Sequence, residues 1–486
     1  MKQEFLTDST YQTPTFQGQF SILECFSHST DLSRPLRMNI LSPFLIGIGL
    51  IVCTQTSLAQ DVDNNRQAIE LVKLAEDVKQ FDPRGPLVQI RELYSQAAEF
   101  DPNLVEARYQ TGLYYLMTEQ HHMAVPHLEK VIELNPDYNI SLRFHMARAY
   151  QYAGEYNKAI AEYEKYLEQL GVGSGSNSNR LYKHIEECQA ALALVKKPVP
   201  VQITNLGDRI NSEWPDYAPM VDHQEQLLFF TSRRETNNHS DLVDDDLFYY
   251  EEIYFSHKEG ATWGEAHQPG SILNTRKHDS NLALSPDGKT LYLYSDKNGG
   301  DIYYSTQQAN GSWSVPEPVV AINSPYRESG ITFSADGSRV YFVSDRPGHM
   351  GNEVNTDIYY APRLSNGKWG QARNLGEEVN TPYDEESPFM DPDGVTLYFS
   401  SRGWNTMGGF DVFKTTFQPE TRTYSHAINL GHPLNSPEDE LGFTVTLDGQ
   451  RAYYSTTRKD SYGYSDLYQI KLSTYQSIRT LGVALD

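Results

Sequence analysis

The chain has 486 residues, of which 21% are charged and 12% aromatic, and its formal net charge is -24. This length is enough for about three domains, and the aromatic content excludes a disordered chain. This negative net charge argues against binding to nucleic acid or to an anionic membrane surface, because the sequence has no cluster of basic residues that could bind phosphate groups.

The first 59 residues are typical of an upstream extension followed by a signal peptide. Arg34 and Arg37 precede Met38, an apolar run of about a dozen residues follows, and residues 57–59 have the small-x-small form of a cleavage site. We therefore predict an exported protein with Met38 as its start.

Cysteine positions leave one alternative for this segment and constrain the mature fold. A lipoprotein signal cut before Cys53 is the alternative, although Val52 is unfavourable before such a cut. The apolar run is shorter than the ~20 residues that a membrane-spanning helix needs. After cleavage at Ala59 only Cys188 remains, which predicts a fold without disulfides.

Residues 60–196 carry the apolar pattern of helical repeats. Gly112, Tyr115, Ala124 and Leu128 have the spacing of a tetratricopeptide repeat, and the next unit repeats the pattern in Ala147, Tyr150 and Ala159. Small residues at these points let paired helices approach closely.

Two further segments extend the predicted helical array. Residues 68–102 form a degenerate earlier unit, and residues 180–195 predict a capping helix after the Gly/Ser/Asn-rich segment 171–179, which reads as a flexible insert. His121 and His122 fall in a turn of a repeat, and we expect them to face solvent.

Residues 197–472 consist of short β-rich segments in five units. An Asn that precedes Ser or Thr recurs, and a turn follows 13 residues later, which is Asp-Gly in four units and Gln224-Glu225 in the first. Asp and Gly accept the positive φ of a tight hairpin. Each of the first four units also has a fourth strand introduced by an aromatic residue. The five Asn are Asn211, Asn274, Asn323, Asn380 and Asn435, and the aromatics are Trp263, Trp313, Trp369 and Tyr424.

The fifth unit has no aromatic-led fourth strand of its own. The segment "VQITNLGDRI" at residues 201–210 matches "ARNLGEEV" and "AINLGHPL" but precedes every other unit. It would complete the last blade and remove the open sheet edges. We predict an α+β multidomain chain: an N-terminal α-helical tetratricopeptide solenoid, a closed five-bladed β-propeller, and a C-terminal tail at residues 473–486.

The strand order predicts one propeller face with repeated charges. In each blade an acid begins the first strand, a cation ends the second and an acid begins the third. Because the pattern recurs in every blade, the favoured interpretation is structural bracing by charge-assisted hydrogen bonds. The alternative is an acidic ring that attracts a cation or a basic partner segment. The first acids are Asp216, Asp279, Glu328, Glu385 and Glu440; the cations are Arg233, Lys297, Arg346, Arg402 and Arg458; the third-strand acids are Glu252, Asp301, Asp357, Asp411 and Asp466.

The first unit has a lengthened hairpin that is rich in carboxylates. Oxygen-rich clusters suit calcium, but the spacing lacks the Gly-punctuated loop of a calcium site. A solvated acidic loop is therefore favoured over a cation site. Its acids are Asp241, Asp244, Asp245, Asp246, Glu251 and Glu252.

Catalytic and cofactor motifs are absent from the sequence. It contains no G-x-S-x-G, H-E-x-x-H, C-x-x-C, P-loop or dinucleotide fingerprint. We therefore predict no catalytic, cofactor-binding or metal-binding residues, and a protein that is not an enzyme.

The propeller segment resembles the WD40-like, TolB-type repeat family. The stretches "FSADGSRVYFVSDRPGHMGNEVNTDIYY" and "MDPDGVTLYFSSRGWNTMGGFDVFKT" are close to that family's S-P-D-G, S-x-R, Gly-Gly and D-I-Y pattern. The resemblance covers residues 201–472 and is weakest in the first blade. Helical repeats in front of this propeller are similar to the front half of Bacteroidetes OmpA-family envelope proteins, including accessory components of type IX secretion and gliding.

This resemblance implies a function without catalysis. We expect an exported scaffold of the periplasm or outer membrane that binds other envelope proteins through both repeat surfaces. The similar proteins usually continue into an OmpA-like domain, which is not expected here after Asp486, so peptidoglycan binding is not carried over. A glycan-binding propeller with its site at the blade-one loop is the first alternative, and a hydrolase relic is the second.

Overall fold

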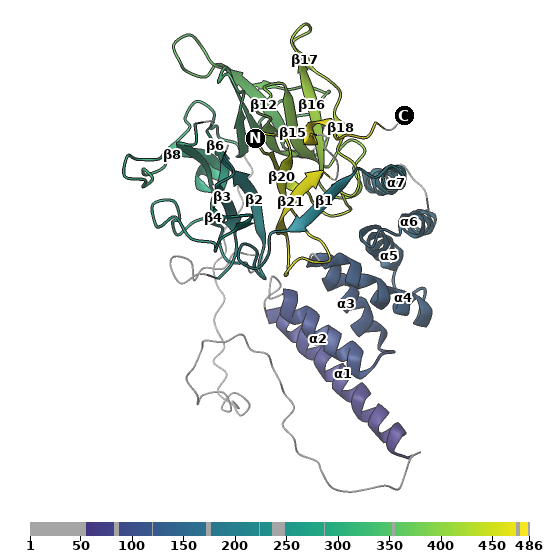
Figure 1. The fold of residues 1–486 in the computed structure, drawn as a ribbon. Helices are drawn as coiled ribbons and strands as arrows, with labels where there is room; N and C mark the ends of the chain where they lie inside the picture. The colour runs from purple at the N-terminus through teal and green to yellow at the C-terminus, as the bar shows by residue number, and fades with distance from the viewer. Residues whose placement is uncertain are drawn as a thin grey trace, which may run out of the picture. The chain divides into compact units, whose positions relative to one another are not determined.

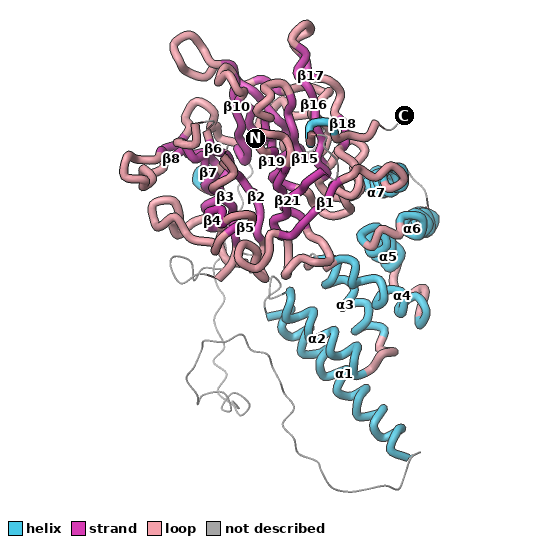
Figure 2. Tube along the Cα trace, viewed as in Figure 1, coloured by secondary structure: helices cyan, strands magenta, loops and turns pink. Residues whose placement is uncertain are grey.

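The computed structural model describes residues 55–81, 87–118, 120–171, 176–222, 224–235, 248–285, 287–351, 355–472 and 477–484. The predictions for residues 1–54 and for the loop acids Asp241, Asp244, Asp245 and Asp246 lie outside these ranges. Helices occupy the N-terminal part of the described chain and strands the rest, as Figure 2 shows in cyan and magenta. No helix in these ranges combines the length and the apolar character that crossing a membrane requires.

Seven α-helices follow one another in the described helical part (Figure 1). The last begins inside the segment that the sequence predicted as a flexible insert, so that prediction is wrong from Ser176 onward. The helices are α1 (Gln55–Phe81), α2 (Leu87–Phe100), α3 (Val105–Met117), α4 (Ala124–Leu134), α5 (Leu142–Tyr152), α6 (Tyr156–Leu170) and α7 (Ser176–Leu194).

Small residues place neighbouring helices in close contact, as the repeat spacing predicted. A Cβ added to Gly112 in α3 would lie 2.7 Å from Leu128 Cγ in α4, which is closer than two carbon atoms can pack. Ala124, Ala147 and Ala159 are fully buried in the same core. The tetratricopeptide spacing therefore identified the helix contacts correctly.

The strands form five antiparallel sheets in chain order, which are the five predicted blades. Blade one contains β2 (Asp216–Val221), β3 (Leu227–Ser232), β4 (Glu252–Glu259) and β5 (Thr262–Trp263). Blade two contains β6 (Asp279–Leu284), β7 (Thr290–Ser295), β8 (Asp301–Thr306) and β9 (Glu317–Pro318). Blade three contains β10 (Glu328–Phe333), β11 (Arg339–Ser344), β12 (Asp357–Pro362) and β13 (Arg373–Asn374). Blade four contains β14 (Glu385–Met390), β15 (Thr396–Ser401), β16 (Asp411–Gln418), β17 (Thr423–Tyr424) and β18 (Ile428–Asn429).

The fifth blade is completed by the strand that precedes all the others. Its own strands are β19 (Leu441–Val445), β20 (Arg451–Thr456) and β21 (Asp466–Leu472). The strand β1 (Val201–Asn205) pairs antiparallel with β21, with Val201 opposite Leu472 and Asn205 opposite Tyr468. The teal arrow of β1 lies beside the yellow arrow of β21 in Figure 1. The predicted closure of the ring is therefore confirmed.

The outer strands are shorter than the sequence pattern suggested. Trp313 and Trp369 form only single bridges with the residue that follows the third strand of their blades, and the outer strands of blades one to four have two residues each. In three blades a hydroxyl of the third strand also binds the outer segment. Ser256, Ser305 and Thr415 donate hydrogen bonds to its backbone carbonyls. These side-chain hydrogen bonds therefore help to hold the outer segment against the third strand where few backbone hydrogen bonds do so.

The C-terminal segment packs against the propeller. The short helix at Ile478–Thr480 buries Ile478, and Leu481 is also buried in the core of the fifth blade. The Arg479 guanidinium forms an ion pair with Asp391 at 2.8 Å. The part of the predicted tail that the structure describes is therefore a component of the propeller.

Candidate functional site at the blade junctions

The repeated Asn residues join each blade to the blade before it. The Asn211 side chain accepts a hydrogen bond from the Leu467 N–H at 2.8 Å and donates to the Leu467 carbonyl at 3.0 Å. The Asn211 side chain thereby satisfies the buried Leu467 N–H, whereas the Leu467 carbonyl also accepts a hydrogen bond from the Leu206 N–H at 3.1 Å. The same arrangement pairs Asn274 with Ile253, Asn323 with Ile302, Asn380 with Ile358, and Asn435 with Val412. Since Leu467 lies in blade five, the Asn211 contact also closes the ring.

The first-strand acids hold the loop that follows each Asn. Glu328 accepts hydrogen bonds from the Ser324 N–H at 2.9 Å and the Ser324 hydroxyl at 2.7 Å. The Ser or Thr after each Asn is therefore the donor to the acid four residues later. The equivalent pairs are Asp216 with Ser212, Asp279 with Thr275, Glu385 with Thr381, and Glu440 with Ser436.

Burial favours the neutral form of several of these acids. Desolvation raises the pKa of both Glu385 and Glu440 to about 8, that of Asp466 to about 7 and that of Asp279 to about 6. The pKa of Asp411 is raised by burial and by the charge of Glu440 in the next blade. One face of the propeller therefore carries buried carboxyl groups close to one another.

An ion pair with the first-strand acid of the same blade forms at the predicted cation in blade three and at the next residue along the chain in blade one. Arg346 forms an ion pair with Glu328 at 2.7 Å and donates to the Ile322 carbonyl at 2.8 Å. In blade one Asp216 pairs at 2.6 Å with Arg234, which follows the predicted Arg233. Arg233 itself donates to the Tyr249 carbonyl at 2.8 Å.

The prediction of a cation between two carboxylates is wrong for the other three blades. Lys297 lies over the Tyr303 ring at 5.0 Å, Arg402 pairs with Asp439 at 3.1 Å, and Arg458 donates to the Pro433 carbonyl at 2.7 Å. The local acids already accept N–H and hydroxyl donors, as Asp301 does from Asn298 and Asp357 from Asn355. The cations of these three blades therefore bind groups outside the ring: an aromatic face, another carboxylate and a backbone carbonyl.

A lysine from the helical repeats approaches this ring instead. Lys183 in α7 is 8% exposed, and its ammonium donates to the Trp404 carbonyl at 3.1 Å and the Gly403 carbonyl at 3.4 Å. Burial lowers the Lys183 pKa, which the charges of Glu187, Asp411, Glu186 and Glu385 partly oppose. The loop after β15 is thus bound by a buried cation from another repeat system.

Two further contacts join the helices to the propeller, one in the loop after β15 and one in the loop before β19. Met407 is fully buried in the hydrophobic core of the helical repeats, and its carbonyl accepts a hydrogen bond from Gln151 Nε2 at 3.3 Å. His121 pairs with Glu438 at 2.7 Å and stacks on Tyr152, with ring centroids 3.9 Å apart. The expectation that His121 faces solvent is therefore wrong, because the propeller covers it.

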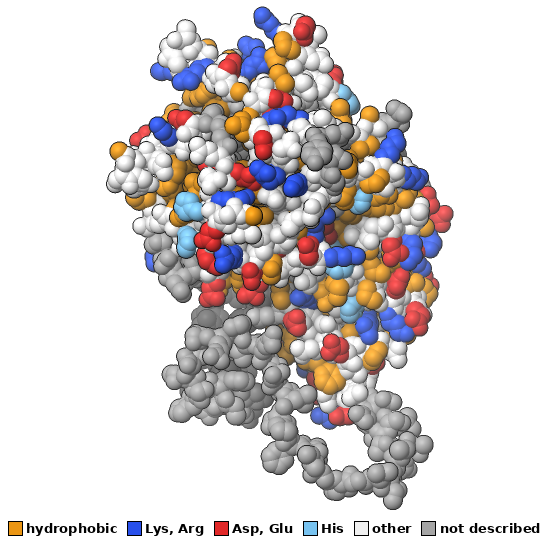
Figure 3. Space-filling view, in the orientation of Figure 1, with side chains coloured by type: hydrophobic (Ala, Val, Ile, Leu, Met, Phe, Trp, Pro, Cys, Tyr) orange, Lys and Arg blue, Asp and Glu red, His pale blue; other side chains and the backbone are white. Residues whose placement is uncertain are grey.

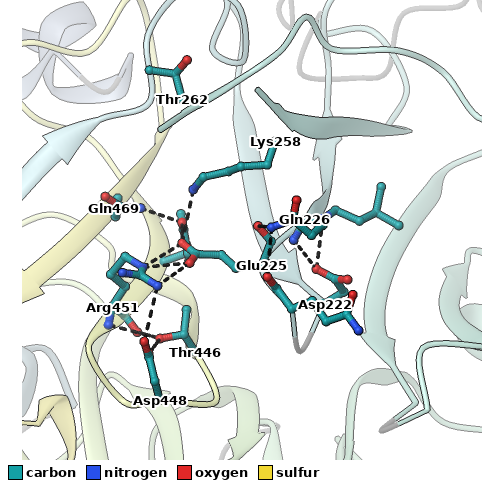
Figure 4. A network of polar contacts seen from close by, with 12 residues as sticks. Asp222, Glu225, Gln226, Lys258, Thr262, Thr446, Asp448, Arg451 and Gln469 are labelled. Atoms are coloured by element: carbon teal, nitrogen blue, oxygen red, sulfur yellow. Dashed lines mark hydrogen bonds and ion pairs between the residues drawn. The ribbon is translucent and has the colours of Figure 1, made fainter. Parts of the chain in front are cut away.

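Glu225, which replaces the Gly of the Asp-Gly turn in the first blade, makes a second contact between blades one and five (Figure 4). Glu225 occupies the glycine position with φ of 53°, and its carboxylate pairs with Arg451 at 2.6 Å and Lys258 at 3.3 Å. Tyr453 of blade five also donates to it. Burial acts to raise the Glu225 pKa, but the donors from Tyr453 and Arg451 outweigh it, so the pKa is lowered.

The contacts described above join blades to one another and to the helices. In the described ranges, no group of three or more His, Cys, Asp or Glu side chains could hold a metal ion. Cys188 is a free, buried thiol in the helical core. Sequence reasoning found the recurring Asn and acids but missed Lys183, Gln151 and Met407.

Comparison with known proteins supports the helical half of this description. The family model described as "Tetratricopeptide repeat" matches residues 105–138 and 140–169. No curated protein matches the sequence.

Solved structures show only distant likeness. MamA is 23% identical over 29% of this chain and 72% of its own, with a TM-score of 0.23. A luciferin-regenerating enzyme is 12% identical over 59% of this chain and 99% of its own, with a TM-score of 0.34. A protein of unknown function from Dyadobacter fermentans is 13% identical over 53% of this chain and 76% of its own, with a TM-score of 0.32. At these values the likeness says nothing about activity or partners.

Proposed function

We propose that this protein is a non-catalytic scaffold that is exported to the bacterial cell envelope, where it holds other envelope proteins as an accessory of a secretion or gliding system. The observation that carries this proposal is the buried attachment of the helical repeats to one propeller loop. Lys183 donates to the Trp404 carbonyl of this loop, and Met407 of the loop packs into the helical core. Two repeat surfaces held in a fixed relation can present two partners to each other.

The surface chemistry is consistent with protein partners. Charged side chains of both signs are interspersed on the face that Figure 3 shows, without one continuous acidic patch. Large apolar side chains are also exposed on both parts, including Ile140 at 56% and Val320 at 78%. Exposed apolar residues framed by charges are the usual components of protein interfaces.

A capture experiment tests this proposal. Immobilised mature protein is mixed with envelope extract, and the captured proteins are compared for the wild type, Ile140→Asp in the helical repeats and Val320→Asp in the propeller. A scaffold is expected to lose a different protein in each variant while keeping the other.

Parallel incubations separate the alternatives. The same protein is mixed with peptidoglycan and with a glycan panel, and assayed for turnover of ester, peptide and glycoside substrates. Binding to a glycan without protein capture would instead support the lectin-type alternative, and turnover would support a hydrolase.

A further inference from the structure

The first strands of all five blades enclose a cavity of about 290 Å³ in the propeller. This volume is at the lower end of the range for small-molecule sites. The cavity lies among residues 218–222, 281–285, 329–335, 387–392 and 442–447, so it is separate from the ring of buried acids and from the helical contact.

The backbone around this cavity is irregular in every blade. All five first strands lie at the edge of their sheets and lose register with the second strand part-way along. Ala218 and Ser387 have φ of 52° and 53°, which is uncommon for residues other than glycine. A Cβ added to Gly330 would lie 3.0 Å from Pro388 Cδ, so bulges of neighbouring blades touch. Bulges and positive φ of this kind are concentrated at binding sites.

The cavity wall is mostly apolar. Small-molecule sites combine such walls with a few polar groups that fix the orientation of the ligand. The larger apolar side chains in the wall are Met220, Leu282, Leu284, Phe333, Phe389 and Phe443.

Blades one and four differ from the other blades because each carries a carboxyl group at the hairpin end of the cavity, Asp222 and Asp391 respectively. Ser285, Ser334 and Thr446 precede the hairpins of blades two, three and five, and each hydroxyl accepts the N–H that begins the next strand. In blade one the Asp222 carboxylate accepts the equivalent N–H, from Leu227 at 3.0 Å. In blade four Asp393 accepts it, from Thr396 at 2.8 Å, which leaves Asp391, fully buried in the cavity lining, without this role.

Only one of the two Asp391 carboxyl oxygens is satisfied. Oδ1 accepts hydrogen bonds from the Asp393 N–H and from Arg479 Nε, both at 2.8 Å, whereas Oδ2 has no partner among the described residues. A buried acceptor without a donor is unfavourable. Because Asp391 does not accept the N–H that begins the next strand, bracing of the hairpin does not account for its carboxyl group.

We propose that this cavity binds a compact apolar molecule that carries one hydrogen-bond donor, an ammonium or hydroxyl group, and that the Asp391 carboxyl group binds this donor. The apolar wall takes the body of the ligand, and the donor satisfies the remaining carboxyl oxygen. This inference does not depend on the scaffold proposal, because it concerns a small molecule and a different part of the propeller.

Three probes of similar shape test the proposal by calorimetry and ligand-observed NMR on the mature protein. Phenethylamine and phenethyl alcohol are expected to bind, and ethylbenzene is expected to bind at least about ten-fold more weakly because it has no donor. The isosteric substitution Asp391→Asn should weaken phenethylamine about ten-fold and leave ethylbenzene unchanged.

Two variants at exposed positions locate the site without disturbing the core. Ala335→Trp fills the hairpin end of the cavity, whereas Val315→Trp adds the same side chain at a position that is 74% exposed and outside the cavity. We expect the first to abolish phenethylamine binding and the second to retain it. Failure of the amine and the alcohol to bind at millimolar concentration, or equal binding to Ala335→Trp, would overturn the proposal. Equal binding of the amine to Asp391→Asn would overturn the role of the carboxyl group.

Discussion

Neighbouring helices of the repeat array contact each other through small residues such as Gly112 and Ala147, whereas neighbouring blades are joined through buried Asn and carboxyl groups. The helical contacts are between segments close in sequence. The blade contacts include the pairs Asn211–Leu467 and Glu225–Arg451, which connect the two ends of the propeller. The helical array is therefore extendable, while the propeller depends on closure.

The two regions also respond in opposite directions to pH. In the helical repeats, burial lowers the pKa of His127 and of His145 to about 4, so both are neutral in the folded chain near neutral pH. In the propeller, burial raises the pKa of Glu385 and of Glu440 to about 8. These two histidines therefore lose protons on folding, whereas Glu385 and Glu440 retain theirs.

The largest effect is expected from breaking the closure of the propeller. Asn211→Leu keeps the size of the side chain but leaves the buried Leu467 N–H without a partner, and it leaves the Leu467 carbonyl with the Leu206 N–H alone. Each unsatisfied group costs about 1–3 kcal/mol, so we expect a loss of about 3 kcal/mol in the free energy of unfolding. Chemical denaturation measures this loss, and amide hydrogen exchange at Leu467 should become faster.

The control for this substitution is Asn366→Leu. Asn366 accepts one hydrogen bond from the Lys368 N–H in an exposed hairpin. Its substitution should change stability by less than about 1 kcal/mol. Equal losses for both variants would show that the inter-blade hydrogen bonds are not what holds the ring closed.

The next effect concerns the contact between the two regions. Met407→Ala removes a fully buried side chain from the helical core and should cost about 2 kcal/mol or more. We expect the helical repeats and the propeller to unfold in better separated transitions, as followed by calorimetry. Met117→Ala, at a side chain that is 57% exposed, is the matched control. Identical calorimetric traces for the two variants would refute the role of Met407.

A smaller effect is expected from pH. Unfolded carboxyl groups titrate near their ordinary values of 3.8 and 4.5, so the folded propeller binds more protons between about pH 4.5 and 8. This contribution to stability is complete below the unfolded pKa and is lost as pH rises through the folded pKa. The histidines act oppositely, but only between about pH 4 and 6.5.

Thermal melts at pH 6.5 and pH 8 isolate the propeller contribution. We expect a lower Tm at pH 8, by roughly 2–4 °C for each 1 kcal/mol lost. Glu385→Gln, which fixes a neutral side chain at this position, should reduce the difference. A Tm that rises between the two pH values would contradict the raised pKa values.

The smallest effect is expected at an exposed ion pair of the helical array. Arg66 and Glu70 in α1 lie 3.2 Å apart with side chains that are 75% and 65% exposed. Glu70→Ala should change the free energy of unfolding by less than about 0.5 kcal/mol. A loss as large as that of Met407→Ala would indicate that surface charge stabilises the helices more than their packing does.

The sequence alone determined the repeat systems and the closure of the ring. The spacing of Gly112 and Leu128 identified helices in contact, and the unmatched segment 201–210 identified the strand that pairs with β21. Both follow from local periodicity, because a repeated unit must bury the same face and bind the same neighbour each time.

Tertiary structure alone decided the partners of the repeated charges and the joining of the two regions. The position of Arg458 predicted an ion pair with Glu440, but the guanidinium binds the carbonyls of Pro433 and Leu434. Likewise, nothing in the spacing of Lys183 and Trp404 marks them as partners, since they are 221 residues apart in separate repeat systems. Periodicity specifies which residues recur, whereas burial and the geometry of the surrounding donors and acceptors determine which contacts a side chain makes.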